Sequence, residues 1–300
     1  MTERGAAKGF RASFKESDVE ATIDAYFFRP LAELMVGVLA KTRVRPNQVS
    51  FASALAGIAS ALCYYQFSYP FIVAGGLLLA LSVIFDAGDG QLARRTGQGS
   101  EVGKLFDNVM DPIKAVSAMF GMAFGMDAVG HWGDWPPMPP QLTTAEAIWG
   151  LGWFSGICLS LQVVTRNYWV DRYHAYGKGR TSLTMADLRL VREEMQVLRQ
   201  KSGYWLEKSI VPVVLAFSKK NATPPQSQGE HPEYVDALRP YVRWWTIFGG
   251  GQQFFVLLIA SLFGLPIVGW LYISVLGNAI YLPLLLLTWR ADRRARSAQG

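Results

Sequence analysis

Six long apolar stretches, separated by polar connections, dominate the sequence. Most of them are long enough to cross the hydrocarbon core of a bilayer, for which a helix needs about 17–25 residues. The second stretch is short by itself, and we expect its helix to continue into the polar segment that follows. The pattern predicts an all-α, polytopic membrane protein with about six transmembrane helices. The predicted spans are residues 50–67, 70–85, 102–129, 145–170, 244–263 and 265–289.

Two further segments have helical patterns but are not predicted to span. Residues 21–42 are apolar but contain Arg29, Pro30 and Glu33, which indicates an N-terminal amphipathic helix lying in the membrane interface. Residues 171–243 are polar overall and carry apolar positions at helical spacing, which predicts a cytoplasmic insertion with an amphipathic surface helix. The predicted organisation is an N-terminal segment at 1–49, a membrane domain at 50–289 that includes this insertion, and a basic tail at 290–300.

Composition and charge agree with a membrane protein and indicate its orientation. Hydrophobic residues make up 51% of the chain and charged residues 17%, a balance unusual for a soluble domain of this length. Lys and Arg are absent from the connections at 68–69 and 130–144 and gather in the others. The positive-inside rule then places the N-terminus in the cytoplasm, and no cleavable signal peptide is visible. An anionic inner leaflet accounts for the net charge of +6 without nucleic acid.

Four aspartates stand out between the second and third apolar stretches. Asp86 and Asp89 are three residues apart, and Asp107 and Asp111 are four apart. Both spacings place side chains on one face of a helix, so two neighbouring helices can direct all four carboxylates into one cleft. Anions this close together repel one another, and some would be protonated unless cations compensated their charge. Oxygen-only ligands of this kind suit Mg²⁺ or Mn²⁺.

A purely structural role is the alternative for these aspartates. They could cap helices or pair with nearby basic residues. Small residues on the same faces favour a ligand site instead, because they leave room where a large side chain would block it. The small residues are Gly90, Ala93 and Gly103, and the basic residues are Arg94, Arg95, Lys104 and Lys114.

The segment DAGDGQLARRTGQGSEVGKLFDNVMD, residues 86–111, resembles the signature of the CDP-alcohol phosphotransferases. It matches D-x-x-D-G-x-x-A-R-x8-G-x3-D-x3-D at every fixed position, and the run RPNQVS before the first span resembles a Pro-Asn run of the same family. The resemblance implies two divalent cations held by the four aspartates, with Asp111 also acting as the general base. It further implies that the cytidine nucleotide is accommodated by the remaining motif positions, which are Gly90, Ala93, Arg94, Gly103 and Asn47.

The resemblance implies a role in phospholipid biosynthesis: transfer of a phosphatidyl group from a CDP-linked lipid, CDP-diacylglycerol first, to an alcohol, with release of CMP. The reverse arrangement, a soluble CDP-alcohol donor and diacylglycerol as acceptor, stays open. An intramembrane prenyltransferase is another alternative, although such enzymes usually carry two Asp-rich motifs. A cation transporter is the non-enzyme alternative and would predict acidic residues near the middle of the membrane.

The acceptor is expected to be a small polar alcohol or an alcohol phosphate. Basic residues after the fourth span could bind an acceptor phosphate, and simple membrane anchoring is the competing interpretation. A homodimer in the inner, cytoplasmic membrane, with its site facing the cytoplasm, is also expected. The candidate basic residues are Arg166, Arg172, Lys178 and Arg180.

Overall fold

The computed structural model describes residues 21–130, 144–179, 185–217 and 230–297. Throughout these ranges the regular elements are helices, with one isolated bridge between Lys178 and Glu230. The all-α class predicted from the sequence is therefore confirmed. The main helices are α2 (Arg29–Leu39), α3 (Pro46–Tyr65), α4 (Tyr69–Thr96), α5 (Glu101–Val129), α6 (Ala145–Arg172), α7 (Leu188–Gln200), α8 (Trp205–Phe217), α9 (Pro232–Trp245), α10 (Gly250–Leu262), α11 (Pro266–Leu271) and α12 (Gly277–Ser297).

Short irregular turns join or extend several of these helices. Wide π-helical turns are found at η1 (Asp24–Phe28), η3 (Tyr173–Gly177) and η5 (Tyr272–Leu276), and a 3₁₀ turn at η4 (Thr246–Phe248). The turn η1 leads directly into α2, and η5 keeps the helices on either side of it continuous, so α11, η5 and α12 form one long segment.

Four segments in the described part of the chain are long and apolar enough to cross a membrane. They are α3, α4, α6 with η3, and the segment from Pro266 to Ser297. A fifth arises if α9 with η4 and α10, which meet at a bend of 41°, form one broken span. The chain is thus a polytopic membrane protein. The third predicted span corresponds to α5, which does not meet this apolar criterion and carries the charged residues Asp107, Asp111 and Lys114.

Several helix boundaries differ from the predicted ones. α3 begins at Pro46, because proline at the first helical position loses no backbone hydrogen bond. α4 continues through the acidic motif to Thr96, as expected, and ends at Gly97 in the left-handed conformation. The fifth predicted span is interrupted at Gly249, whose extended backbone separates η4 from α10. The predicted C-terminal tail is helical as far as Ser297.

Helix α2 forms within the predicted interfacial segment and packs against α4. Ala32 and Val36 are buried on one side, whereas Leu34 and Val38 are largely exposed. An exposed apolar face opposite a buried one fits a helix that contacts both protein and lipid.

Helix α3 packs along both α4 and α5, which contact each other much less. Helices α3 and α5 approach each other very closely along one seam. A Cβ atom placed on Gly57 would lie 2.3 Å from Cβ of Lys114, and one on Gly121 would lie 2.3 Å from the carbonyl oxygen of Ala61. Small residues of this kind allow helix backbones to approach closely in membranes. The seam therefore fixes α5 against α3 at the level of Lys114.

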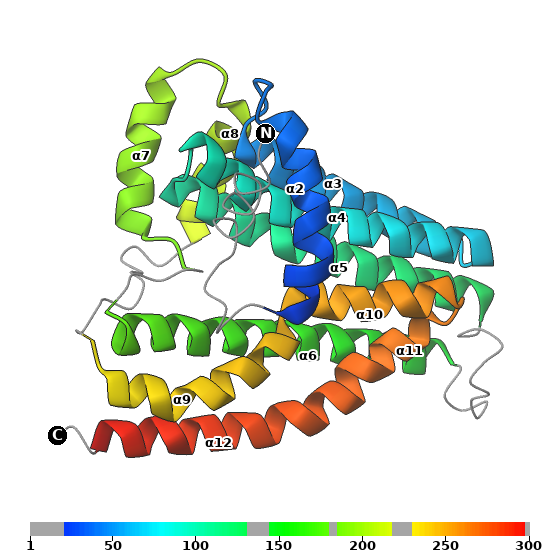
Figure 1. Ribbon diagram of the computed structural model, residues 1–300. Coiled ribbons are helices and arrows are strands. Elements are labelled where there is room, and N and C mark those ends of the chain that lie inside the picture. Colours follow the sequence, from blue (N-terminus) through cyan, green and yellow to red (C-terminus); the bar gives the residue numbers. More distant parts are fainter. Residues whose placement is uncertain (1–20, 131–143, 180–184, 218–229, 298–300) are drawn as a thin grey trace, which may run out of the picture.

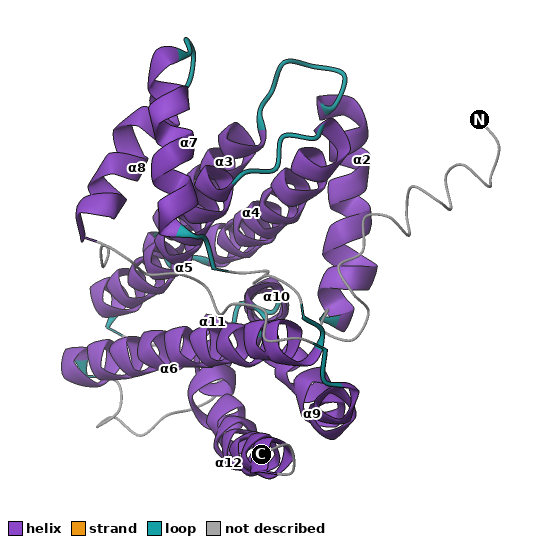
Figure 2. Cartoon of the chain, turned by 90° about the vertical axis from the view of Figure 1, so that its left-hand side faces the viewer, coloured by secondary structure: helices purple, strands orange, loops and turns teal. Residues whose placement is uncertain are grey.

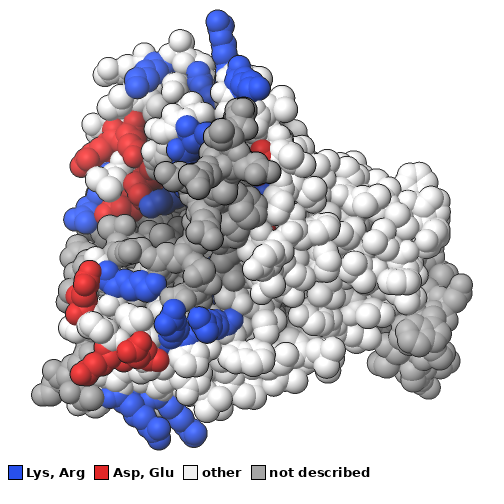
Figure 3. Space-filling view, viewed as in Figure 1, with Lys and Arg blue, Asp and Glu red and all other residues white. Residues whose placement is uncertain are grey.

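The elements are arranged so that charge collects at one end of the molecule. Helices α3, α4, α5 and α10 run side by side, with α6, α9 and α12 alongside them (Figure 1). In the space-filling view nearly all charged side chains of the described residues lie over the end where α7 is found, and the other described residues on that face are mostly uncharged (Figure 3). Seen toward this end, α7 and α8 lie beside the ends of α3 and α5 (Figure 2). We refer to it as the charged end.

Candidate active site

The structure brings three of the four motif aspartates together. Asp86 and Asp89 come from α4 and Asp107 from α5, and one carboxylate oxygen of each lies within 4.8 Å of the other two. Asp89 is buried and accepts a hydrogen bond from the hydroxyl of Ser50 on α3. The helical spacing in α4 and the turn from Gly97 to Ser100 thus produce the cluster that the sequence predicted.

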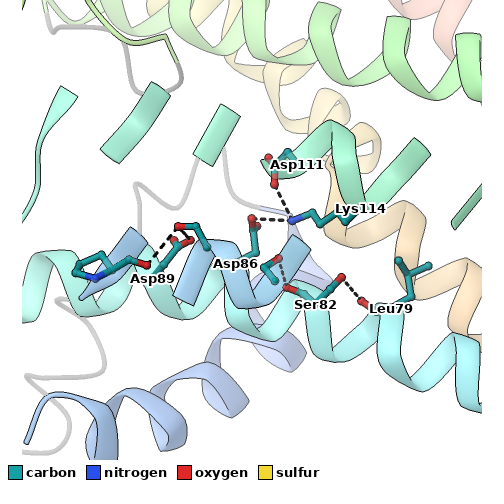
Figure 4. A network of polar contacts seen from close by, with 9 residues as sticks. Leu79, Ser82, Asp86, Asp89, Asp111 and Lys114 are labelled. Carbon is teal, nitrogen blue, oxygen red and sulfur yellow. Dashed lines mark hydrogen bonds and ion pairs between the residues drawn. The ribbon is translucent and has the colours of Figure 1, made fainter. Parts of the chain in front are cut away.

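Lys114 joins the fourth aspartate to this cluster. Its ammonium lies 2.7 Å from Oδ1 of Asp86 and 2.7 Å from Oδ1 of Asp111, and its side chain is only 4% exposed. Figure 4 shows the lysine between the two carboxylates. The sequence interpretation treated Lys114 as one of several possible ion-pair partners, and its position one turn after Asp111 was the available signal. A buried ammonium between two carboxylates attracts both and offsets their mutual repulsion.

The carboxylates fit a divalent cation. Three acidic side chains present oxygens at mutual distances suited to a shared hard cation. In addition, Oδ1 of Asp107 is buried, and no donor in the described part of the chain makes a hydrogen bond to it. An orphaned buried carboxylate oxygen beside two other carboxylates is the arrangement expected of a metal ligand.

The aspartates lie in the wall of a cavity of about 400 Å³. α4 and α5 form one side of it, and α6, the start of α10 and the η1–α2 segment contribute the rest. Its volume suits a small-molecule ligand. Charged and polar residues in its wall, besides the aspartates and Lys114, are Asp24, Arg29, Arg94, Lys104, Asn108, Ser160, Arg166 and Asn167.

Only some of the residues that the resemblance assigned to nucleotide binding lie in the cavity wall. Gly90 and Arg94 are in the cavity wall, whereas Ala93, Gly103 and Asn47 are not among its described lining residues. Asn47 instead donates to Oε1 of Glu207 on α8, over 2.9 Å. A Cβ atom on Gly103 would lie 3.3 Å from Oδ1 of Asn47. These two residues therefore meet each other at the start of α5, beside the cavity.

Of the candidate acceptor-binding residues, Arg166 on α6 lies in the wall of the cavity that the aspartates also line. Arg172 is engaged elsewhere: its Nε lies 2.7 Å from Oδ1 of the buried Asp292, which also accepts from Tyr234 and Arg296. Lys178 places its ammonium 5.1 Å from the centre of the Tyr173 ring. Arg180 lies outside the described residues.

A second, apolar cavity of about 290 Å³ lies between α5 and α6. It shares four residues with the wall of the first cavity, so the two adjoin. Phe120, Trp149 and Trp153 supply aromatic surface at its far end. The shared residues are Ala115, Val116, Leu159 and Ser160.

Comparison with known proteins agrees with the motif. A family model described as CDP-alcohol phosphatidyltransferase matches residues 43–199. Archaetidylinositol phosphate synthase of Pyrococcus horikoshii is 34% identical over 87 residues, 29% of this chain and 45% of the relative. The protein of the same name from Aeropyrum pernix is 35% identical over 89 residues, 30% of this chain and 44% of the relative. The chain thus spans less than half the length of these two relatives.

Proposed function

The chain belongs to the CDP-alcohol phosphatidyltransferase family, and we propose that it transfers a phosphatidyl-type group from a CDP-linked lipid to an alcohol, releasing CMP. The observation that carries this proposal is the cluster of Asp86, Asp89 and Asp107 in the wall of a cavity that adjoins an apolar one. Such a site can receive a charged diphosphate and a lipid chain together. We assign the reaction to phospholipid biosynthesis.

Asp86, Asp89 and Asp107 are assigned as ligands for a divalent cation, Mg²⁺ or Mn²⁺, with Asp111 contributing to a second cation site. When bound, these cations would neutralise the diphosphate oxygens of the donor. Gly90 and Arg94 face the same cavity, and we assign them to the nucleotide: Gly90 leaves space and Arg94 pairs with phosphate. Ala93, Gly103 and Asn47 keep the supporting role in nucleotide binding that the resemblance implies.

Asp111 is assigned a second role, as the general base. Its side chain is 48% exposed, far more than that of Asp89, and its carboxylate is held by Lys114. Because Asp111 lines the cavity, an acceptor hydroxyl held there can give up its proton to this carboxylate as it attacks the phosphorus distal to cytidine. The bond from that phosphorus to the bridging oxygen breaks, and CMP leaves.

The lipid part of the donor is placed in the apolar cavity between α5 and α6. The two cavities share the wall formed by Ala115 and Leu159, so one molecule can occupy both. Burial of a lipid chain against Met119 and Phe120 would then position the diphosphate beside the aspartates. CDP-diacylglycerol is the donor we propose, with transfer from a soluble CDP-alcohol to diacylglycerol as the second candidate.

For the acceptor we propose an alcohol phosphate. The names of both relatives specify a product with an inositol phosphate group, and Arg166 contributes to the wall of the cavity that the aspartates line. Arginine binds phosphate oxygens through paired hydrogen bonds. The charged end is assigned to the cytoplasmic face of the inner membrane because the chain's basic residues gather in the connections on that side, and the active molecule is proposed to be a homodimer.

Replacing Arg166 by Ala is expected to raise the acceptor KM about 10- to 100-fold and to change the donor KM by less than about threefold, because only the acceptor phosphate loses its partner. Steady-state kinetics with CDP-diacylglycerol and inositol phosphate would measure both constants. Arg172→Ala is the comparison: it removes an arginine that pairs with Asp292, so it is expected to lower stability without this selective change. Equal changes in both KM values for Arg166→Ala would contradict the assignment.

The proposed reaction is tested directly with the detergent-purified full chain. Labelled CDP-diacylglycerol and a set of alcohols and alcohol phosphates are supplied with Mg²⁺ or Mn²⁺, and CMP and lipid products are measured. We expect CMP release that depends on an acceptor and stops with EDTA. Absence of CMP release, together with prenyl transfer from a prenyl diphosphate or with cation flux in vesicles, would support one of the two alternatives.

A further inference from the structure

The α7–α8 hairpin, part of the long polar insertion, contacts the start of α5. The carboxylate of Glu194 on α7 accepts the backbone N–H groups of Glu101 and Val102, at 3.1 and 2.8 Å. These are the first two residues of α5, whose N–H groups have no partner within their own helix. Ser100 accepts the N–H of Gly103. The N-terminus of α5 is therefore capped partly by its own sequence and partly by another helix.

The capping is reciprocal. The carboxylate of Glu101, in the first turn of α5, accepts the backbone N–H of Asp187 at the start of α7, over 2.8 Å. Asp187 in turn accepts the backbone N–H of Arg189, and this bond holds the pKa of the Asp187 carboxyl below its ordinary value. Each helix thus uses an acidic side chain of the other at its own N-terminus, where negative charge is stabilising.

Apolar packing holds the two helices in this position. Val191 and Met195 of α7 are fully buried against Val102 and Phe106 of α5. α8 extends the same cluster through Leu206 and Val211. The hairpin therefore covers the side of α5 that lies away from the cavity.

The hairpin also contacts the start of α3. Arg45 lies 3.9 Å above the centre of the Tyr204 ring and donates to the carbonyl oxygen of Gly203, both in the turn between α7 and α8. Glu207 of α8, which is buried, accepts from Asn47. The hairpin therefore joins the start of α3 to the start of α5.

These contacts lie close to the aspartates along α5. Asp107 is five residues beyond Val102, which is about 7.5 Å at the rise of an α-helix. Because α5 has few direct contacts with α4 and is joined to it mainly through α3, a hairpin that holds the starts of both α3 and α5 contributes to placing Asp107 against Asp86. We propose that Glu194 is a positioning residue for the carboxylate site, because it fixes the turns of α5 that precede Asp107.

The test compares two adjacent acidic residues of α7 in the full chain. Glu194→Ala removes the cap, and Glu193→Ala removes the same charge from an exposed neighbouring position. The first readout is Mn²⁺ affinity of the purified protein without substrates, measured by calorimetry. We expect Glu194→Ala to weaken Mn²⁺ binding about fivefold, less than the about 10–100-fold seen for residues that contact metal ligands directly. Glu193→Ala is expected to stay within about twofold of the parent protein.

Conservative variants separate positioning from general stability. Glu194→Asp keeps an acceptor and is expected to recover most of the Mn²⁺ affinity, and Glu194→Gln, which keeps one carbonyl oxygen, is expected to be intermediate. These two variants also allow the proposal to be tested if Glu194→Ala does not fold. Equal Mn²⁺ affinity for the Glu194 and Glu193 variants, or a lower melting temperature without a change in affinity, would overturn the proposal.

The second readout, turnover, rests on the proposed function. Glu194→Ala is expected to lower kcat about fivefold at saturating donor and to raise the Mn²⁺ concentration required for half-maximal rate. If the parent protein releases no CMP, the proposed function fails, but the order of Mn²⁺ affinities still decides the role of Glu194. The two proposals can therefore fail separately.

Discussion

Replacing Asp111 by Asn is expected to lower turnover by about 10² to 10⁴ while leaving most of the donor affinity in place. The loss corresponds to removal of a positioned proton acceptor. Donor affinity is expected to persist because Asp86, Asp89 and Asp107 form the compact group of carboxylates and Asp111 stands outside it. Asn is close to Asp in size, so the change removes basicity and charge with little change in packing.

The comparison set is the same substitution at the three clustered aspartates. Asp86→Asn, Asp89→Asn and Asp107→Asn are each expected to weaken metal and donor binding together, since a neutral amide cannot replace a carboxylate ligand. Donor binding at saturating Mg²⁺ or Mn²⁺ is measured beside turnover for all four variants. Near-normal turnover of Asp111→Asn, or loss of donor binding as complete as that of Asp86→Asn, would show that the assignment as base is wrong.

Replacing Lys114 by Met is expected to lower the free energy of unfolding by about 2 to 3 kcal/mol in the presence of EDTA. Breaking a buried ion pair by removing one partner usually costs about 3 to 5 kcal/mol. The smaller value is expected here because the Asp111 side chain is 48% exposed, so water solvates part of the charge that remains. Without the ammonium, Asp86 and Asp111 repel each other across the space that it occupied.

Divalent cation is expected to reduce this loss, because bound Mg²⁺ or Mn²⁺ compensates the same carboxylates. Thermal unfolding in detergent, with EDTA and with Mg²⁺, measures both effects. Lys104→Met is the control, since Lys104 pairs with Glu101 at the surface with its side chain 38% exposed, and such pairs contribute about 0.2 to 1 kcal/mol. Equal melting temperatures for the two variants in EDTA would contradict a central role for Lys114.

The sequence predicted the parts of the site that depend on local helical spacing. Asp86 and Asp89 lie within one turn of one helix, and a short turn at Gly97 brings the next helix back, so periodicity alone placed the carboxylates together. Lys114 was harder to assign, because several basic residues lie within reach of the motif along the chain. Its pairing with Asp86 depends on how α5 packs against α3 at Gly57, which no local pattern encodes.

The same limit applies to Arg166 and Arg172. Both lie near the end of the fourth apolar stretch and are equivalent in a charge count. The structure distinguishes them because Asp292, which lies more than 100 residues later in the chain, binds Arg172. The number of spans stays a prediction for a related reason: hydropathy counts the charges of α5 against a span, whereas the fold pairs Lys114 with Asp111, so a helix with polar groups can still pack among apolar neighbours.

One continuous helix, α4, contains both an apolar segment and the first half of the acidic motif. Its 28 residues extend about 42 Å, which exceeds the about 30 Å of a typical hydrocarbon core. Asp86 is the eighteenth residue from Tyr69, about 26 Å along the axis. We therefore expect hydrophobic matching to set the depth of the aspartate cluster: a thicker bilayer would draw Asp86 toward the acyl chains, and a thinner one would move it out among the headgroups. The length of α4 would thus link the proposed phosphate chemistry to the thickness of the membrane in which the protein lies.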